Sequence, residues 1–118
     1  MIDGVENLTS LLGDNDNYNM HDSQIRTINY DMVNQTMDVT VEVIGSHLSS
    51  SDYDIFMDMH FSNIIAVNMR YADYQYIDEM RIYKENGYIT CDFDCVFMQV
   101  TCCTLKIDPI RFEACKEE

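Results

Sequence analysis

The chain has 118 residues, enough for one domain with its own hydrophobic core. Apolar residues make up 47% of it, which is typical of a globular protein and argues against general disorder. The 21 acidic residues outnumber the 7 basic ones and give a net charge of −14. We therefore expect no binding to nucleic acid or to anionic membranes, because both need clusters of Lys and Arg. Such a charge either attracts a basic protein partner or only keeps the protein soluble.

No targeting segment is visible in the sequence. The first residues, MIDGVENLTS, lack the basic region and apolar core of a signal peptide. No run approaches the roughly 20 apolar residues of a membrane span. The odd number of cysteines, five, then predicts reduced thiols in a cytoplasmic protein.

The first predicted element is a short amphipathic helix at residues 4–12, where Val5, Leu8 and Leu11 share one face. It is too short to be stable alone, so we expect its leucines to pack on a sheet. After a polar loop at 14–19, strands are predicted at 24–30 and 36–44, and the second of these alternates apolar and polar residues.

The later half of the chain shows the clearest strand patterns. Residues 53–61 alternate most regularly, and a separate strand is predicted at 64–71 after Ser62-Asn63. Asn86-Gly87 predicts a two-residue hairpin turn inside the segment 76–107. A change of apolar phase near residues 98–102 indicates a bulge or twist in the last strand. Asp108-Pro109 is expected to end the sheet.

These elements predict a mainly β fold, at the border of α+β, in a single domain covering residues 1–118. We expect about seven strands at 24–107, each able to pair with its predecessor in one antiparallel sheet. The sheet would be curled or folded into a sandwich or half-barrel, with one short N-terminal helix. Residues 111–118 are expected to form a solvated tail.

His21-Asp22-Ser23 contains the residue types of a hydrolase triad. A triad needs three side chains that converge, whereas consecutive residues of an extended segment point to alternating sides. We interpret His21, Asp22 and Ser23 as a structural turn at a strand entry, with Asp22 or Ser23 bonding local backbone amides. The sequence therefore predicts no catalytic residue.

The cysteines and the acidic loop argue against a metal. Cys91 and Cys95 would lie ~13 Å apart on one strand, whereas two thiolates on one zinc lie within ~4.6 Å of each other. Cys102 and Cys103 are adjacent and should face opposite ways. We favour buried, reduced thiols and expect no metal and no cofactor. The loop at 14–19 fails the calcium-loop pattern at three positions, which hold Tyr18, Asn19 and Ile25.

Two stretches of the sequence are acidic: at residues 52–58 carboxylates alternate with other residues, and at residues 71–79 tyrosines and carboxylates occur together. Tyrosine is favoured at protein interfaces, and carboxylates there would select a basic partner. The alternative is that the tyrosines cap a sheet edge and the acids are merely solvated. The predicted partner-binding residues are Asp52, Asp54, Asp58, Tyr71, Asp73, Tyr74, Tyr76, Asp78 and Glu79.

The segment HDSQIRTINYDMVNQTMDVTVEV, at residues 21–43, resembles the strand-turn-strand entry of small bacterial immunity proteins from polymorphic-toxin systems. The resemblance continues at Phe61-Ser62-Asn63-Ile64, at the acidic segment near Tyr76-Ile77 and at a final LKID, and it covers residues 21–110. The CDFDC segment and the Cys102-Cys103 pair depart from the pattern, and the N-terminal helix lies outside it.

The resemblance implies a cytoplasmic, non-catalytic protein that binds a cognate toxin domain. The acidic charge agrees with a basic, nuclease-like target, whose positive cleft an inhibitor can occupy. Two other classes stay open: a small metal-binding or hydrolytic domain that uses His21, His60 and the cysteines, and an accessory β-domain without a specific ligand. The sequence leaves the oligomeric state open.

Overall fold

The computed structural model describes residues 1–12, 17–44, 46, 48, 51–70, 76–93 and 98–115. Its elements are, in chain order, β1 (Ile2–Asp3), α1 (Val5–Leu12), β2 (Asn17–Asp31), β3 (Thr36–Val43), β4 (Tyr53–Met69), β5 (Tyr76–Glu85), β6 (Tyr88–Phe93), β7 (Met98–Ile107) and β8 (Arg111–Ala114). The mainly β prediction and the short N-terminal helix are confirmed.

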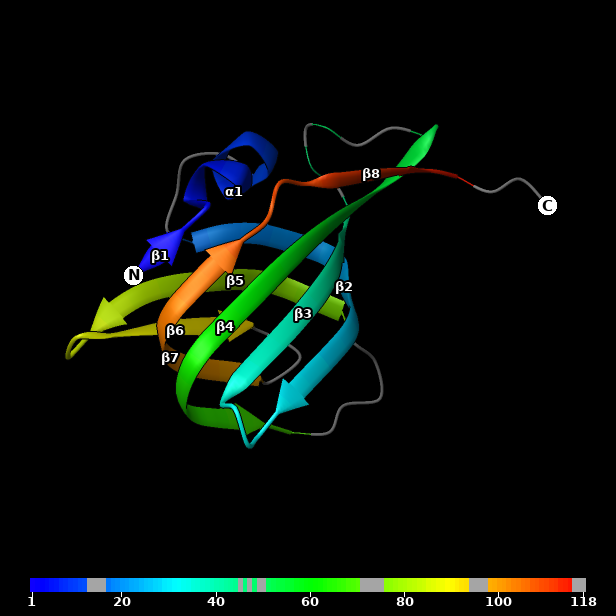
Figure 1. The fold of residues 1–118 in the computed structure, drawn as a ribbon. Helices are drawn as coiled ribbons and strands as arrows, with labels where there is room; N and C mark the ends of the chain where they lie inside the picture. Colours follow the sequence, from blue (N-terminus) through cyan, green and yellow to red (C-terminus); the bar gives the residue numbers. More distant parts are fainter. Residues whose placement is uncertain are drawn as a thin grey trace.

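The eight strands form one sheet in the order β1-β7-β6-β5-β2-β3-β4-β8. β1 runs parallel to β7 over two residues, and all other pairs are antiparallel. The sheet is strongly curled, so that β4 also pairs with β7 along its second half (Figure 1). The predicted single, curled antiparallel sheet is therefore correct.

The hydrophobic core lies inside the curl. It is built from the inward side chains of the alternating strands, among them Val39, Val41, Met57, Met59 and Phe61. Helix α1 packs near one end of the curled sheet (Figure 1), and its Leu8 and Leu11 are completely buried. The leucines therefore dock on the sheet as predicted. Within the described ranges, no helix has the length and apolar character needed to cross a membrane.

Gly4 joins β1 to α1 at a position that excludes any side chain. Its φ is +87°, and a Cβ added there would lie 2.0 Å from the backbone oxygen of Ile107. The Asn7 side chain closes the same junction, because its Nδ2 donates to the Ile107 oxygen at 2.9 Å. The helix start is thereby fixed against the end of β7.

Three strand predictions were wrong in detail. The two strands expected at 53–61 and 64–71 are one strand, β4, in which Asn63 has a φ of 52° instead of ending the strand. β2 begins at Asn17, so residues 21–23 lie within a strand rather than in a turn. β5 pairs with β2 and not with its predecessor β4, because the curl of the sheet separates β4 from β5.

The predicted bulge and the predicted tail also need correction. A register shift occurs opposite Thr101 and Cys102 of β7, within the predicted range, but the extra residue is in β4, between Ile64 and Ala66. The change of phase in β7 falls at Cys103 and Thr104, after Cys102 rather than before it. Residues 111–114 form β8 and pair with the start of β4, so the sheet continues beyond Asp108-Pro109.

Candidate protein-binding surface

The outward side chains of β3, β4 and β8 form one surface, which we call the acidic face. In β3 and β4 they point outward because they alternate with buried residues, and Arg111 and Glu113 of β8 lie opposite Phe56 and Asp54 on the same side. Antiparallel pairing of β3 with β4 and of β4 with β8 places them in adjacent rows. The acidic face consists of Asp38, Thr40, Glu42, Asp54, Phe56, Asp58, His60, Arg111 and Glu113.

Asp58 is held at the centre of this face. Arg111 donates to it twice, from Nε to Oδ2 at 2.6 Å and from Nη2 to Oδ1 at 3.2 Å. The Thr40 hydroxyl donates to Asp58 Oδ1 at 2.8 Å. Hydrogen bonding by Arg111 lowers the pKa of the Asp58 carboxyl; partial burial opposes this shift, and Thr40 adds to it. Asp58 is therefore a fixed carboxylate at neutral pH.

His60 bridges two strands and a connection on the same face. Its Nδ1 lies 2.6 Å from Asp38 Oδ1, and its Nε2 lies 2.7 Å from Asp108 Oδ2. Burial by itself lowers the pKa of His60, but the hydrogen bonds with Asp108 and Asp38 outweigh it and raise the pKa above its usual value. Because both neighbours are carboxylates, both ring nitrogens act as donors in the charged imidazolium.

Aromatic rings adjoin the charged groups near β8. The guanidinium of Arg111 lies over the Phe56 ring, 5.2 Å from its centroid. Tyr53 and Phe112 meet edge to face, with ring centroids 5.0 Å apart. Phe112 is 50% exposed and lies opposite Ile55, so its ring is on the other side of β8 from Arg111 and Glu113. This combination of aromatic and charged side chains is typical of protein interfaces.

The predicted residues of the first stretch lie on or beside the acidic face. Asp54 and Asp58 belong to it, and Asp52 precedes β4 and accepts a hydrogen bond from the Cys115 backbone N–H at 3.1 Å. Asp58 is engaged by Arg111, which the sequence analysis placed in the tail. The sequence shows Arg111 among acidic residues, but the pairing of β8 with β4 that brings it to Asp58 was not predicted.

Most of the predicted residues of the second stretch lie outside the described part of the chain. Tyr71, Asp73 and Tyr74 lie outside the described residues, as do the side chains of Tyr76 and Asp78, whose backbone belongs to β5. Glu79 is partly buried in β5. In the sheet, β2 and β3 lie between β5 and β4, so Glu79 is separated from the residues of the first stretch.

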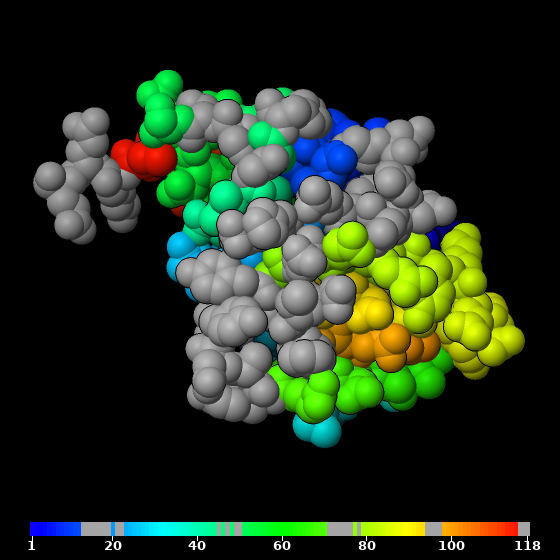
Figure 2. Space-filling view, turned by 180° about the vertical axis from the view of Figure 1, so that it is seen from behind, coloured from blue at the N-terminus to red at the C-terminus, as the bar shows by residue number. Residues whose placement is uncertain are grey.

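A second surface, which the sequence analysis missed, lies on the outside of β5, β6 and β7 and the end of β4 (Figure 2). Two shallow pockets meet there at Gln99, with volumes of about 350 and 410 Å³. We call this surface the polar face. Its pocket-lining residues are Asn68, Arg70, Asp92, Met98 and Gln99 in one pocket, and Tyr83, Glu85, Asn86, Tyr88, Thr90, Gln99 and Thr101 in the other.

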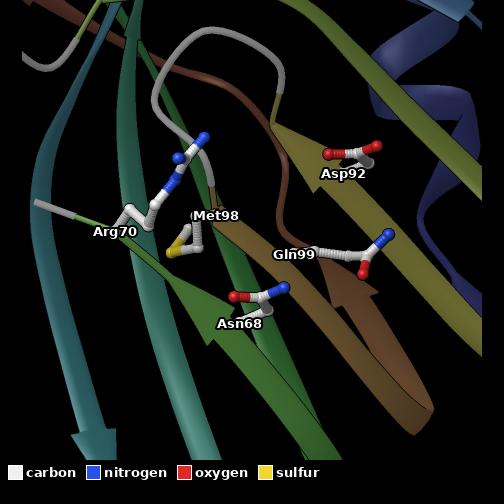
Figure 3. A pocket seen from close by; sticks show the side chains of 5 residues that line it. All are labelled: Asn68, Arg70, Asp92, Met98 and Gln99. Atoms are coloured by element: carbon white, nitrogen blue, oxygen red, sulfur yellow. The ribbon is translucent and has the colours of Figure 1, made fainter. Parts of the chain in front are cut away.

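Two contacts between described residues of the polar face are long. Gln99 Nε2 lies 3.4 Å from the Tyr83 hydroxyl, and the hydroxyls of Thr90 and Thr101 are 3.3 Å apart. In the first pocket, Arg70 and Asp92 lie on opposite sides (Figure 3). The alternation of these residues was visible in the sequence, but the pairing of β4 with β7 that brings them together was not.

Ser23 has a structural role in the described part of the motif at 21–23. It is completely buried, and its Oγ accepts a hydrogen bond from the Ile44 backbone N–H at 3.0 Å. The partner is at the end of β3 and not a local amide as predicted. The side chains of His21 and Asp22 lie outside the described residues.

The cysteines divide into two environments. Cys91 and Cys102 are buried and unpaired, in agreement with the prediction, whereas Cys103 and Cys115 are exposed, contrary to it. Burial raises the pKa of the Cys102 thiol to about 11 and that of Cys91 well above its usual value. Cys95 lies outside the described residues. Among the residues that the structure describes, no three His, Cys, Asp or Glu side chains are arranged to hold a metal ion.

Comparison of the chain with protein-family models, with curated proteins and with solved structures finds no match. The functional argument therefore depends on the surfaces described above.

Proposed function

We propose that this chain is a cytoplasmic, non-enzymatic binding protein of the immunity type. It would neutralise a cognate, basic, nuclease-like toxin domain by covering its surface. The observation that carries the proposal is the excess of carboxylates on and around the acidic face. Asp38, Glu42, Asp52, Asp54, Asp58, Asp108 and Glu113 are opposed there, among the described residues, by Arg26, His60, Lys106 and Arg111.

The ion pairs that fix these charged side chains in place support a binding role. Arg26 pairs with Glu42, and Arg111 pairs with both Asp58 and Glu113. Side chains that are already fixed lose less conformational freedom when a partner binds. The remaining negative field would speed the encounter with a basic surface. The same carboxylates would oppose the positive groups with which a nuclease holds phosphates.

The proposal is tested by charge reversal at matched sites. We compare a triple variant, Asp52→Lys, Asp54→Lys and Glu113→Lys, with a control triple variant, Glu6→Lys, Glu85→Lys and Asp92→Lys, which has the same net charge. The test uses a toxin domain found in a neighbouring gene or captured by pull-down, and stopped-flow mixing gives the association rate at low and high salt. We expect the acidic-face variant to associate at least about tenfold more slowly, and the control to change by less than about threefold.

Two results would contradict the proposal. One is an association rate of the unaltered protein that does not fall as salt rises. The other is an equal slowing in the two triple variants, because the acidic face would then contribute nothing beyond net charge.

A further inference from the structure

β7 and β8 lie one after the other along the same edge of β4 (Figure 1). β7 pairs with Met59–Met69, and β8 pairs with Tyr53–Phe56. Between β7 and β8, residues 108–110 do not pair with β4 as a strand. The Asp108 N–H still donates to the backbone oxygen of Asp58 at 3.0 Å. β8 thus extends the sheet beyond the end of β7.

The opposite edge of β7 is covered along its length, whereas the described part of the chain forms no strand pair with the opposite edge of β8. β6 pairs with Met98–Cys102, and β1 pairs with Leu105 and Lys106. The Asn7 side chain then bonds the Ile107 oxygen. Pro109 has no N–H to leave unpaired. No described residue forms a strand pair with the outer edge of β8, and all four of its residues are exposed.

The register shows which backbone groups lie on that edge. The Cys115 N–H donates to Asp52, and Glu113 lies opposite Asp54 two positions before it. In an antiparallel ladder, alternate residues direct their N–H and C=O groups to the same partner. Glu113 and Cys115 therefore face β4, whereas Phe112 and Ala114 direct their N–H and C=O groups away from it.

The side chains around this edge select the chemistry of an added strand. On one face, Phe112 is half exposed and offers an apolar contact. On the other face, Glu113 lies beside Asp54, and Asp52 follows at the end of the same edge. A complementary strand would alternate apolar with basic side chains. A second copy of this chain is disfavoured, because each copy has a net charge of −14.

We propose that the outer edge of β8 binds an extended segment of the partner with alternating apolar and basic residues, which joins the sheet as an additional strand. This inference rests on the proposed function and adds the docking mode. Main-chain hydrogen bonds to Phe112 and Ala114 supply affinity in such strand addition, and the flanking side chains supply specificity.

The test uses the full chain and a synthetic peptide of alternating Lys and Val, with a Glu and Val peptide as the charge control. NMR measures amide hydrogen exchange in the unaltered protein. We expect the Lys peptide to slow exchange at Phe112 and Ala114, and the Glu peptide to have no effect. Ala114→Pro removes one outward N–H and should weaken binding roughly tenfold, whereas Ala114→Val keeps it and should bind within about twofold of the unaltered protein.

The possible failures are distinguishable. If the Lys peptide binds with salt dependence but slows neither amide, the edge is not the docking site and the acidic-face proposal stands. If neither peptide binds anywhere, the attraction for basic chains fails as well. If the free protein is a dimer that Ala114→Pro dissociates, the occupant is a second copy and the partner assignment is wrong. The exchange measurement needs no variant, so it decides even if Ala114→Pro does not fold.

Discussion

The acidic face and the polar face are outer surfaces of the same curled sheet, but they are held together in different ways. On the acidic face, charged groups from distant parts of the chain bond one another at 2.6 to 2.7 Å, as in the Asp58–Arg111 and His60–Asp108 pairs. On the polar face, neutral groups approach at 3.3 to 3.4 Å, and Arg81 lies 5.3 Å from the centre of the Tyr83 ring.

The two faces therefore differ in how firmly their polar side chains are held. Short, charge-assisted bonds fix side-chain positions and connect β3, β4 and β8 into one unit. The contacts of Gln99 with Tyr83 and of Thr90 with Thr101 are longer and join neutral groups, so we expect them to hold these side chains less firmly. We therefore expect substitutions on the acidic face to change stability and partner binding together, and equivalent substitutions on the polar face to change little.

The largest expected effect on stability is that of Arg111→Ala. The Asp58 side chain, which is 19% exposed, would lose both bonds from Arg111 and keep one from Thr40. Because Arg111 is itself 46% exposed, water partly compensates, and we expect a loss of about 1 kcal/mol in the free energy of unfolding. Urea denaturation measures it.

Arg81→Ala on the polar face is the matched control for this substitution. Its contact with the Tyr83 ring is exposed to solvent, so we expect a loss below about 0.5 kcal/mol. Equal losses in the two variants would show that the two faces do not differ in the way proposed.

A smaller effect is expected from pH, through His60→Gln. The folded state raises the pKa of His60, so it binds the proton more tightly than the unfolded chain does. The stabilisation of the fold by protonated His60 is complete below 6.5, the pKa of His60 in the unfolded chain. It is lost as pH rises through the higher pKa of His60 in the folded protein. The free energies of unfolding of the unaltered protein and of His60→Gln should therefore converge from about pH 6 upward.

This comparison isolates one residue, since His21 and His47 are present in both proteins. Urea denaturation at a series of pH values checks it. A difference that stays constant with pH would show that the His60 bonds do not depend on its charge.

The features that the sequence predicts correctly depend on residues close together in the chain. The alternation of Met57, Met59 and Phe61 identified their buried side correctly. Asn86-Gly87 forms the expected turn, with φ of 54° and 82°. Both features follow from local backbone geometry, which one strand or one turn determines.

The features that the sequence did not predict depend on distant pairing. The bonds of His60 join residues 22 and 48 positions away, which come together through the β3–β4 and β4–β7 registers. β8 was missed because Asp108-Pro109 was interpreted as the end of the sheet, whereas the length of β4 offers an edge for four more residues. The residue pattern of one segment does not show which strand of the sheet has an edge available for pairing.

The smallest expected effect compares two threonines. Thr40→Val removes a charge-assisted bond to Asp58, and we expect a loss of about 0.5 kcal/mol. Thr90→Val removes a long hydroxyl contact with Thr101, and because valine suits a strand we expect a change within about 0.3 kcal/mol.

A double variant of Thr40→Val with Arg111→Ala then measures the connection between the two bonds on Asp58. Once Arg111 is gone, Asp58 depends more on Thr40, so the loss in the double variant should exceed the sum of the single losses. Urea denaturation of the four proteins gives this coupling. Strict additivity would mean that the two bonds act independently, and that the acidic face is a set of separate pairs rather than one connected unit.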